Sequence, residues 1–319
     1  MEKTLDVIAL GEALIDFTES GTSPAGARLF EQNPGGAPAN VACAVARLGG
    51  RAAFLGKVGG DMHGRFLRHT LSEAGVDVSG MIVDGGVFTT LAFVVLGESG
   101  ERSFSFARKP GADTCLAPEE IDPELLKRGK LLHVGSLSLT DEPARSATFR
   151  AVELARGLGL TVAYDPNYRA SLWPDEATAK EGMGSLVPLC DVMKLSDEET
   201  ELLTGVTAPE AAAEKLLERG VSCVVVTLGG DGAMVATKEG SRRVASFPTR
   251  AVDTTGAGDA FWGAFLTQLA RNDKVPENLT LDEAARYARF ANAAASLCVG
   301  RRGGIPAMPT LAEVEAINK

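Results

Sequence analysis

The feature that most limits the possible folds of this chain is a regular alternation of short apolar runs and longer amphipathic segments. The run at 222–228 contains Cys-Val-Val-Val-Thr-Leu, which is apolar at nearly every position and not only at every second one. A strand with this pattern is typically buried on both faces, as in a parallel sheet covered by helices. The alternation therefore predicts an α/β fold with a mainly parallel sheet between two layers of helices.

The predicted elements follow one another along almost the whole chain. Strands are predicted at 5–10, 52–58, 130–135, 160–165, 191–195 and 222–228. Helices are predicted at 38–48, 63–74, 142–157, 176–187, 208–219, 257–271 and 281–299. Because no internal repeat or long linker divides the 319 residues, we expect a single domain that spans 1–319.

One region departs from this alternation. Segments 89–96 and 102–107 flank a Gly-Glu-Ser-Gly-Glu turn, and phenylalanines alternate with serines in the second segment. This pattern predicts a β-hairpin with one apolar face, which we expect to form a small sheet together with the segment near 12–34. An apolar face outside the core has to be covered, either by a partner subunit or by a closed ligand site.

The composition limits the kinds of partner. Lys and Arg number 32 and Asp and Glu number 42, so the formal net charge is −10. Such an acidic chain repels phosphate backbones, and we expect no nucleic-acid partner. The apolar run near the amino terminus is too short for a signal peptide, and no stretch approaches the roughly 18 apolar residues of a membrane span. We therefore expect a cytoplasmic protein that does not associate with membranes.

The segment most informative about chemistry is Asp253-Thr-Thr-Gly-Ala-Gly-Asp259, which leads into a predicted amphipathic helix. The N–H groups of Gly256, Ala257 and Gly258 point outward at such a helix start, and the helix dipole adds positive partial charge. This arrangement suits a phosphate that gains charge in a transition state. Asp259 can then take a proton from an attacking hydroxyl. The alternative is that Asp259 is only a favourable charge at the helix dipole.

A second glycine-rich segment, Asn33-Pro-Gly-Gly-Ala-Pro-Ala-Asn40, also stands at a predicted helix start. Gly35 and Gly36 let the backbone come close to a ligand, and the Asn40 amide offers both a donor and an acceptor to a sugar hydroxyl. The structural alternative is a tight turn followed by a helix.

A third glycine-rich segment, Thr227-Leu-Gly-Gly-Asp-Gly232, follows a predicted strand. In an open parallel sheet, ligands bind at loops that follow the carboxyl ends of strands. A simple hairpin turn between 222–228 and 233–237 explains the same residues equally well. The fingerprints of other nucleotide-binding folds, such as a glycine motif directly after the first strand, are missing. This argues against a nicotinamide-dependent oxidoreductase, which the βα alternation alone would permit; a non-catalytic sugar-binding module is a further alternative.

Taken together, the segments ending at Asn40 and Asp259 resemble the two signatures of the ribokinase-like (PfkB-type) family of sugar kinases. They stand in the family's order and 219 residues apart (259 minus 40), and the resemblance extends from about residue 5 to about residue 310. It implies a ribokinase-like three-layer α/β/α core with a small β lid over the sugar, formed by about 12–34 and 88–110. It also implies transfer of the γ-phosphoryl group of ATP to a primary hydroxyl of the sugar.

The resemblance also implies roles for individual residues. Asp259 would be the general base, and the N–H groups of Gly256, Ala257 and Gly258 would form the anion hole. The residues assigned to the sugar are Asp16, Gly35, Gly36, Asn40, Arg108 and Arg169. The residues assigned to ATP are Lys194, Ser196, Thr227, Gly229, Gly232, Gly258 and Asn292.

Two cation sites follow from the same resemblance. Leu195-Ser-Asp-Glu-Glu199 is similar to the family's N-x-x-E motif, whose Glu organises waters of Mg²⁺. Ser196 replaces the Asn of that motif but Glu199 keeps its place, so Mg²⁺ dependence is expected. From the residues alone, acidic side chains at a helix start are the preferred explanation of Asp197, Glu198 and Glu199. The family also binds a monovalent cation such as K⁺ at positions that match Asp253 and Thr255.

Within the family, the segments at 11–17, 103–110 and 165–169 look most similar to bacterial fructokinases, which implies that D-fructose is phosphorylated at its 6-hydroxyl. Kinases of 2-keto-3-deoxygluconate share much of this pattern. Arg108 and Arg169 do not distinguish the two substrates, because an arginine can bind either sugar hydroxyls or the carboxylate of a sugar acid. Another ribokinase-like sugar or nucleoside kinase is also possible. The expected partners are the sugar and ATP, and the apolar hairpin face predicts a homodimer through the lid.

Overall fold

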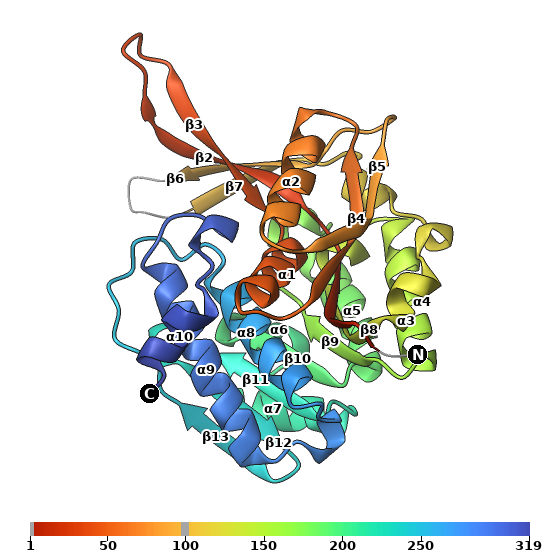
Figure 1. The fold of residues 1–319 in the computed structure, drawn as a ribbon, viewed down its shortest axis with the longest axis vertical. Coiled ribbons are helices and arrows are strands. Elements are labelled where there is room, and N and C mark those ends of the chain that lie inside the picture. The colour runs from red at the N-terminus through yellow and green to blue at the C-terminus, as the bar shows by residue number, and fades with distance from the viewer. Residues whose placement is uncertain (1–2, 97–101) are drawn as a thin grey trace.

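A computed structural model describes residues 3–96 and 102–319 of the chain and contains two β-sheets (Figure 1). The large sheet has seven parallel strands. Two further strands extend one of its edges, and each of them pairs antiparallel with the strand before it. Its strands are, in spatial order, β13 (Gly240–Val244), β12 (Ala233–Thr237), β11 (Cys223–Thr227), β10 (Val192–Ser196), β9 (Thr161–Asp165), β8 (Gly129–Gly135), β1 (Leu5–Leu10), β4 (Ala52–Gly59) and β5 (Asp77–Asp84).

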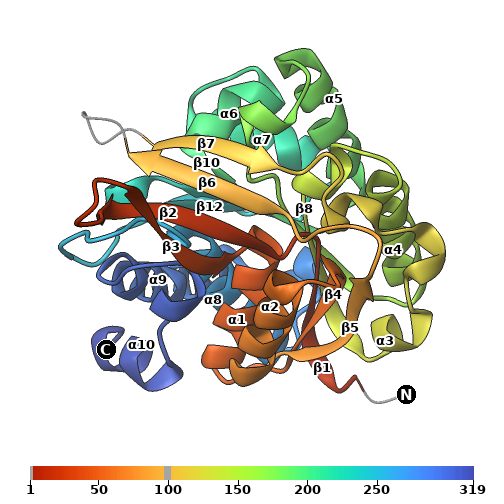
Figure 2. The same ribbon diagram turned by 90° about the horizontal axis from the view of Figure 1, so that it is seen from above.

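Helices cover both faces of the large sheet, which gives three layers (Figure 2). One face carries α1 (Ala37–Arg47), α2 (Met62–Glu73), α8 (Ala257–Arg271), α9 (Leu281–Val299) and α10 (Leu311–Ile317). The other face carries α3 (Pro123–Lys127), α4 (Ala144–Gly157), α5 (Glu176–Leu186), α6 (Asp197–Thr204) and α7 (Pro209–Glu218). The predicted α/β/α fold with a mainly parallel sheet is confirmed.

The apolar runs in the strands are explained by this double coverage. In β11, Val225 packs into the core on one face of the sheet, while Val224 and Val226 pack into the core on the other. All three side chains are fully buried. Burying a valine contributes roughly 1.5–3 kcal/mol, so an uninterrupted apolar run stabilises a central strand at every position.

Every strand and helix predicted from the sequence is present, and the boundaries differ by at most two residues. The structure adds elements with weaker sequence patterns, among them β5, α3 and α10. The segments 222–228 and 233–237 form the antiparallel pair β11 and β12, so the hairpin alternative for the turn between them is correct.

The small sheet has the order β3-β2-β6-β7, with β2 (Leu14–Thr22), β3 (Arg28–Gly35), β6 (Leu91–Leu96) and β7 (Arg102–Ala107). The antiparallel pairing of β6 and β7 confirms the predicted hairpin, while its Gly-Glu-Ser-Gly-Glu turn at 97–101 lies outside the described residues. Since β2 follows β1 closely and β3 leads into α1, this sheet stands at the carboxyl edge of the large one (Figure 1).

The two faces of the small sheet have different characters. Asp16 and Phe106 face a cavity between the two sheets. On the opposite face the rings of Phe17 and Phe93 stack with centroids 5.4 Å apart, and Phe30 meets Phe93 edge to face. Within the described residues, no helix combines the length and the hydropathy that crossing a lipid bilayer requires.

Candidate active site

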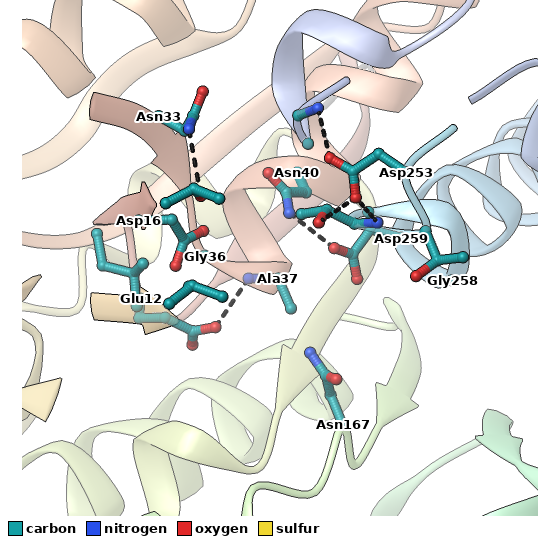
Figure 3. Close-up of a pocket in the computed structure, with 18 of the residues that line it drawn as sticks. Glu12, Asp16, Asn33, Gly36, Ala37, Asn40, Asn167, Asp253, Gly258 and Asp259 are labelled. Atoms are coloured by element: carbon teal, nitrogen blue, oxygen red, sulfur yellow. Dashed lines mark hydrogen bonds between the residues drawn. The ribbon is translucent and has the colours of Figure 1, made fainter. Parts of the chain in front are cut away.

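A cavity of about 370 Å³ lies between the small sheet and the carboxyl edge of the large sheet, where α1 and α8 begin (Figure 3). Parallel strands end at this edge, and helix N-termini that point to it add positive partial charge. Many of the predicted site residues meet here. Those that line the cavity are Asp16, Gly36, Asn40, Arg169, Lys194, Asp253, Thr255, Gly256, Gly258 and Asp259.

The Asp259 carboxylate is buried in the first turn of α8, with its side chain 9% exposed. Its Oδ2 accepts a hydrogen bond of 2.7 Å from Nδ2 of Asn40, which comes from α1 (Figure 3). Burial raises the pKa of Asp259 to about 6, and the negative charge of Asp165 adds to this increase, while the Asn40 bond and the charge of Lys194 oppose it. The carboxylate is therefore ionised at neutral pH but binds a proton readily.

The start of α8 leaves N–H groups open toward the cavity. Gly256 is the N-cap residue, with a φ of 76°, and no side chain caps the helix. The N–H group of Ala257 donates to the carbonyl oxygen of Thr254 at 3.3 Å, whereas those of Gly256 and Gly258 have no acceptor among the described residues. Of the three predicted anion-hole donors, the structure thus leaves Gly256 and Gly258 fully open and engages Ala257 with the protein.

The start of α1 requires its glycines. Gly36 has a φ of 103°, and a Cβ atom at this position would lie 2.4 Å from the carbonyl oxygen of Glu12. A Cβ atom at Gly35 would lie 2.2 Å from Oδ2 of Asp16. The tight-turn alternative is therefore correct as a description of the backbone, and the turn brings Asn40 to Asp259.

The other predicted sugar residues divide into two groups. Asp16, on β2, and Arg169 line the cavity, and Nη1 of Arg169 donates to its neighbour's carbonyl oxygen, that of Tyr168. The Arg108 guanidinium instead lies behind the cavity wall with 3% of its side chain exposed. Its Nε donates to Asp113 Oδ2 at 2.8 Å and its Nη2 to the carbonyl oxygen of Leu137 at 2.9 Å. Arg108 therefore does not line the cavity, and protein groups already accept from its nitrogens.

Apart from Lys194 and Gly258, the predicted nucleotide residues do not line this cavity. Gly229 and Gly232, with φ values of 55° and 102°, form the tight turn between β11 and β12 that Thr227 precedes. Nδ2 of Asn292, on α9, donates to the carbonyl oxygens of Val244 and Ala245 at 2.9 and 3.2 Å. These contacts give the residues structural roles, and their contact with ATP remains a prediction.

Glu199 also has a structural role. Its Oε2 accepts hydrogen bonds from the backbone N–H and the hydroxyl of Ser196, which form the capping box of α6, and its Oε1 accepts the Tyr168 N–H at 2.6 Å. Glu199 therefore stabilises the start of α6, as the alternative explanation predicted. Across 3–96 and 102–319, no three His, Cys, Asp or Glu side chains gather as a metal cluster.

Asp253 and Thr255 do come together. Oδ1 of Asp253 accepts hydrogen bonds from the N–H and the hydroxyl of Thr255, and Oδ2 accepts the N–H of Gly303 at 3.0 Å. The carboxylate thus folds the loop that precedes α8 onto the chain beyond α9. Carboxylate and carbonyl oxygens in such a loop are the donor type that suits a hard cation.

Among the cavity-lining residues that sequence reasoning did not assign, Glu12 and Asn167 have unusual environments. Glu12 is 3% exposed, its Oε1 accepts the Ala37 N–H at 2.8 Å, and burial raises its pKa to about 7. Asn167 has a φ of 46°, which is uncommon for a residue other than glycine and is often found at functional sites. A possible sequence signal is their position, since each follows the carboxyl end of a parallel strand.

A buried carboxylate beside open N–H groups at a helix start suits an enzyme that transfers a phosphoryl group to a hydroxyl. The profile of the pfkB family carbohydrate kinases matches residues 4–311. The chain belongs to this family and is a phosphotransferase that acts on a sugar hydroxyl.

Its similarity to fructokinases covers almost the whole chain. It is 44% identical to a probable fructokinase-2 of Arabidopsis thaliana, over 98% of this chain and 94% of the relative. Solved fructokinases from Xylella fastidiosa, with bound ATP, and Vibrio cholerae O395, with fructose, ADP and calcium ion, both superimpose with a TM-score of 0.90. They are 35% and 36% identical and cover 99% and 100% of this chain, and 98% and 100% of their own.

Proposed function

We propose that this protein is a fructokinase, which transfers the γ-phosphoryl group of ATP to the 6-hydroxyl of D-fructose. The observation that carries the proposal is the buried Asp259 carboxylate, which lies in the cavity beside the open N–H groups that begin α8. The ligands of the similar fructokinases, ATP in one and fructose with ADP in the other, support the choice of substrates.

In the proposed reaction, the sugar oxygen attacks the γ-phosphorus and the bond from that phosphorus to ADP breaks. The hydroxyl proton passes to Asp259, whose pKa of about 6 leaves it ionised at neutral pH. Asn40 holds Oδ2 of this carboxylate by a hydrogen bond and so fixes the other oxygen toward the cavity. The N–H groups of Gly256 and Gly258 and the dipole of α8 stabilise the charge on the transferring phosphoryl group.

The charge of the cavity supports a neutral sugar over a sugar acid. The acidic residues that line it are Glu12, Asp16, Glu19, Glu31, Asp253 and Asp259, and the basic ones are Arg169, Lys194 and Arg302. Because the acidic residues outnumber the basic ones, the cavity carries excess negative charge, which disfavours the carboxylate of 2-keto-3-deoxygluconate. We propose that Asp16, Gly36, Asn40 and Arg169 hold fructose.

We propose that ATP extends from the start of α8 toward Ser196 and the turn at 227–232, with Asn292 beyond it. Glu199 contacts Mg²⁺ through water, and Asp253 and Thr255 hold a monovalent cation such as K⁺. The bound cations supply positive charge that offsets the phosphates. Related kinases with ATP and Mg²⁺, and with fructose, ADP and potassium ion, support the choice of nucleotide and cations.

We further propose that 1–319 is one kinase domain whose small sheet is a lid over the sugar, and that the outer face of this sheet joins two copies of the protein in the cytoplasm. The outer face takes the place of the predicted hairpin face, because Phe106 on that face lines the cavity. The partly exposed rings of Phe17, Phe30 and Phe93 and the 45% exposed Leu29 support this interface. Gel filtration at several concentrations is expected to give a dimer, and a monomer at every concentration would contradict the interface.

Initial rates on several acceptors test the proposed substrate. With ATP and Mg²⁺, we expect sugar-dependent ADP release with the highest kcat/KM for fructose, and fructose 6-phosphate as the product. The comparison acceptors are 2-keto-3-deoxygluconate, ribose and adenosine. A higher kcat/KM for any of these would assign the chain to another kinase of the family.

A further inference from the structure

Two lysine side chains are buried among the described residues, and each is paired with a carboxylate. Lys194 and Lys57 are both 5% exposed. Nζ of Lys194 donates to Oδ2 of Asp165 at 2.7 Å, and Nζ of Lys57 lies 2.7 Å from Oε2 of Glu120. Desolvation of both charges offsets most of their attraction, so a buried pair of this kind is weak evidence of net stability.

The surroundings of the two lysines differ. Lys194, on β10, lines the cavity, and a Cβ atom placed on Gly258 would lie 3.2 Å from its Nζ. The ammonium group therefore lies beside the open N–H groups at the start of α8. Lys57, on β4, does not line the cavity, and its Nζ also donates to the carbonyl oxygen of Cys115.

Asp165 holds Lys194 in a defined charge state. Burial lowers the pKa of the Lys194 ammonium, but the negative charges of Asp165 and Glu199 outweigh this effect and raise the pKa overall. Asp165 ends β9 and is 2% exposed, and its second oxygen, Oδ1, is buried without a hydrogen-bond partner in the described part of the chain. Its side chain therefore acts through Lys194 and through its charge.

We infer that Asp165 is a positioning residue for phosphoryl transfer, which holds the Lys194 ammonium beside Gly258, where its charge meets the transferring phosphoryl group. The inference rests on the proposed kinase function and extends it. The N–H groups at the helix start carry only partial charges, whereas an ammonium fixed in a cavity adds a full charge that does not have to reorient during the reaction. Without Asp165, this side chain loses the one charged hydrogen-bond partner that the described residues give it.

Asp165 also acts on the base. Several charged or titratable groups interact with Asp259. They are Asp165, Arg169, Lys194 and Cys298, and the neutral amide of Asn40 donates a hydrogen bond to it. The negative charge of Asp165 raises the pKa of Asp259, and the positive charge of Lys194 lowers it. Replacing Asp165 by Asn removes the first effect, so the pKa of Asp259 falls as long as Lys194 stays charged.

The test compares Asp165→Asn with the wild-type protein. At pH 8.5, where Asp259 is ionised in both, we expect kcat to fall at least about tenfold, while KM for fructose changes less than about threefold. The acid limb of kcat/KM is expected to move to lower pH. An unchanged kcat, or an acid limb that stays in place, would overturn the inference. If the wild-type protein itself releases no ADP with fructose, the proposed function fails instead.

Glu120→Gln is the matched control, because it leaves the other buried lysine without its closest carboxylate. We expect this variant to lose less thermal stability than Asp165→Asn, because Oδ2 of Asp84 remains 3.6 Å from Nζ of Lys57. Its kcat and its pH profile are expected to stay near wild-type values. Equal losses of kcat in both variants would mean that Asp165 has a structural role only.

A double variant keeps the inference testable if Asp165→Asn folds poorly. Asp165→Asn with Lys194→Gln removes both charges and leaves no unpaired buried ion. If Asp165 acts through Lys194, kcat of the double variant at pH 8.5 equals that of Lys194→Gln alone. A double variant whose loss is the product of the two single losses would show independent roles and would overturn the positioning role.

Discussion

The two glycine-rich helix starts of this protein are alike in sequence and different in use. Helices α1 and α8 both begin after a glycine with positive φ, Gly36 and Gly256, and neither has a side-chain cap on its N-cap residue. At α1, the Ala37 N–H donates to Oε1 of Glu12. At α8, the Gly258 N–H has no acceptor among the described residues. One helix start is closed by the protein, and the other is open to a ligand.

The difference teaches that a glycine-rich helix start is not by itself an anion site. Few N–H groups remain at the start of α1, because Pro38 has none, Asn40 donates to the carbonyl oxygen of Gly36, and Ala37 already has a carboxylate partner. Glu12 therefore satisfies the end of a helix whose role is to present Asn40 to the base. The start of α8 keeps its positive partial charge for the phosphoryl group.

The strongest test of this comparison replaces the carboxylate at each helix start by its amide. We expect Asp259→Asn to lower kcat at least about 100-fold, because the amide cannot accept the hydroxyl proton. KM for fructose is expected to change far less. Glu12→Gln is expected to lower kcat less than about tenfold, because its amide oxygen still accepts the Ala37 N–H.

Steady-state kinetics with fructose and ATP distinguish the two variants. Near wild-type kcat for Asp259→Asn would rule out its role as base. A larger loss for Glu12→Gln than for Asp259→Asn would reverse the roles that we assign to the two helix starts.

A smaller effect is expected on stability, and its pH dependence differs between the two carboxylates. Burial raises the pKa of Asp259 from 3.8 to about 6 and that of Glu12 from 4.5 to about 7. When the pKa of an acid is higher in the folded than in the unfolded protein, stability is highest below the unfolded-state pKa. It falls as the pH rises from there through the folded-state pKa. Each ionised group therefore lowers stability at pH 8 by about 3 kcal/mol.

Thermal unfolding between pH 3.5 and about pH 8 checks this expectation, with denaturation followed by circular dichroism. Relative to wild type, Asp259→Asn is expected to gain stability mainly between about pH 4 and 6, and Glu12→Gln between about pH 4.5 and 7. A gain that is independent of pH would show that packing, and not ionisation, causes it.

How far the sequence predicts the site depends on whether a role is set locally. The glycine turns and the position of Asp259 in the first turn of α8 follow from backbone conformation and periodicity, and the structure reproduces them. The environment of Arg108 was not predictable, because Asp113 and the Leu137 carbonyl reach it only in the folded chain. Local sequence likewise gave no sign that Asn292 binds backbone carbonyls near β13.

The sequence by itself determined the succession of strands and helices along the chain, because this depends on apolar periodicity. It also determined the two glycine turns that precede α1 and α8, because their φ values are set locally. Only the tertiary structure decided which helix start stays open and which carboxylate becomes the buried base. Glu12 reaches Ala37 across 25 residues and Asn40 reaches Asp259 across 219 residues. Such partners meet only when the sheet and its helices pack, and desolvation and hydrogen bonding then set the chemistry of each group.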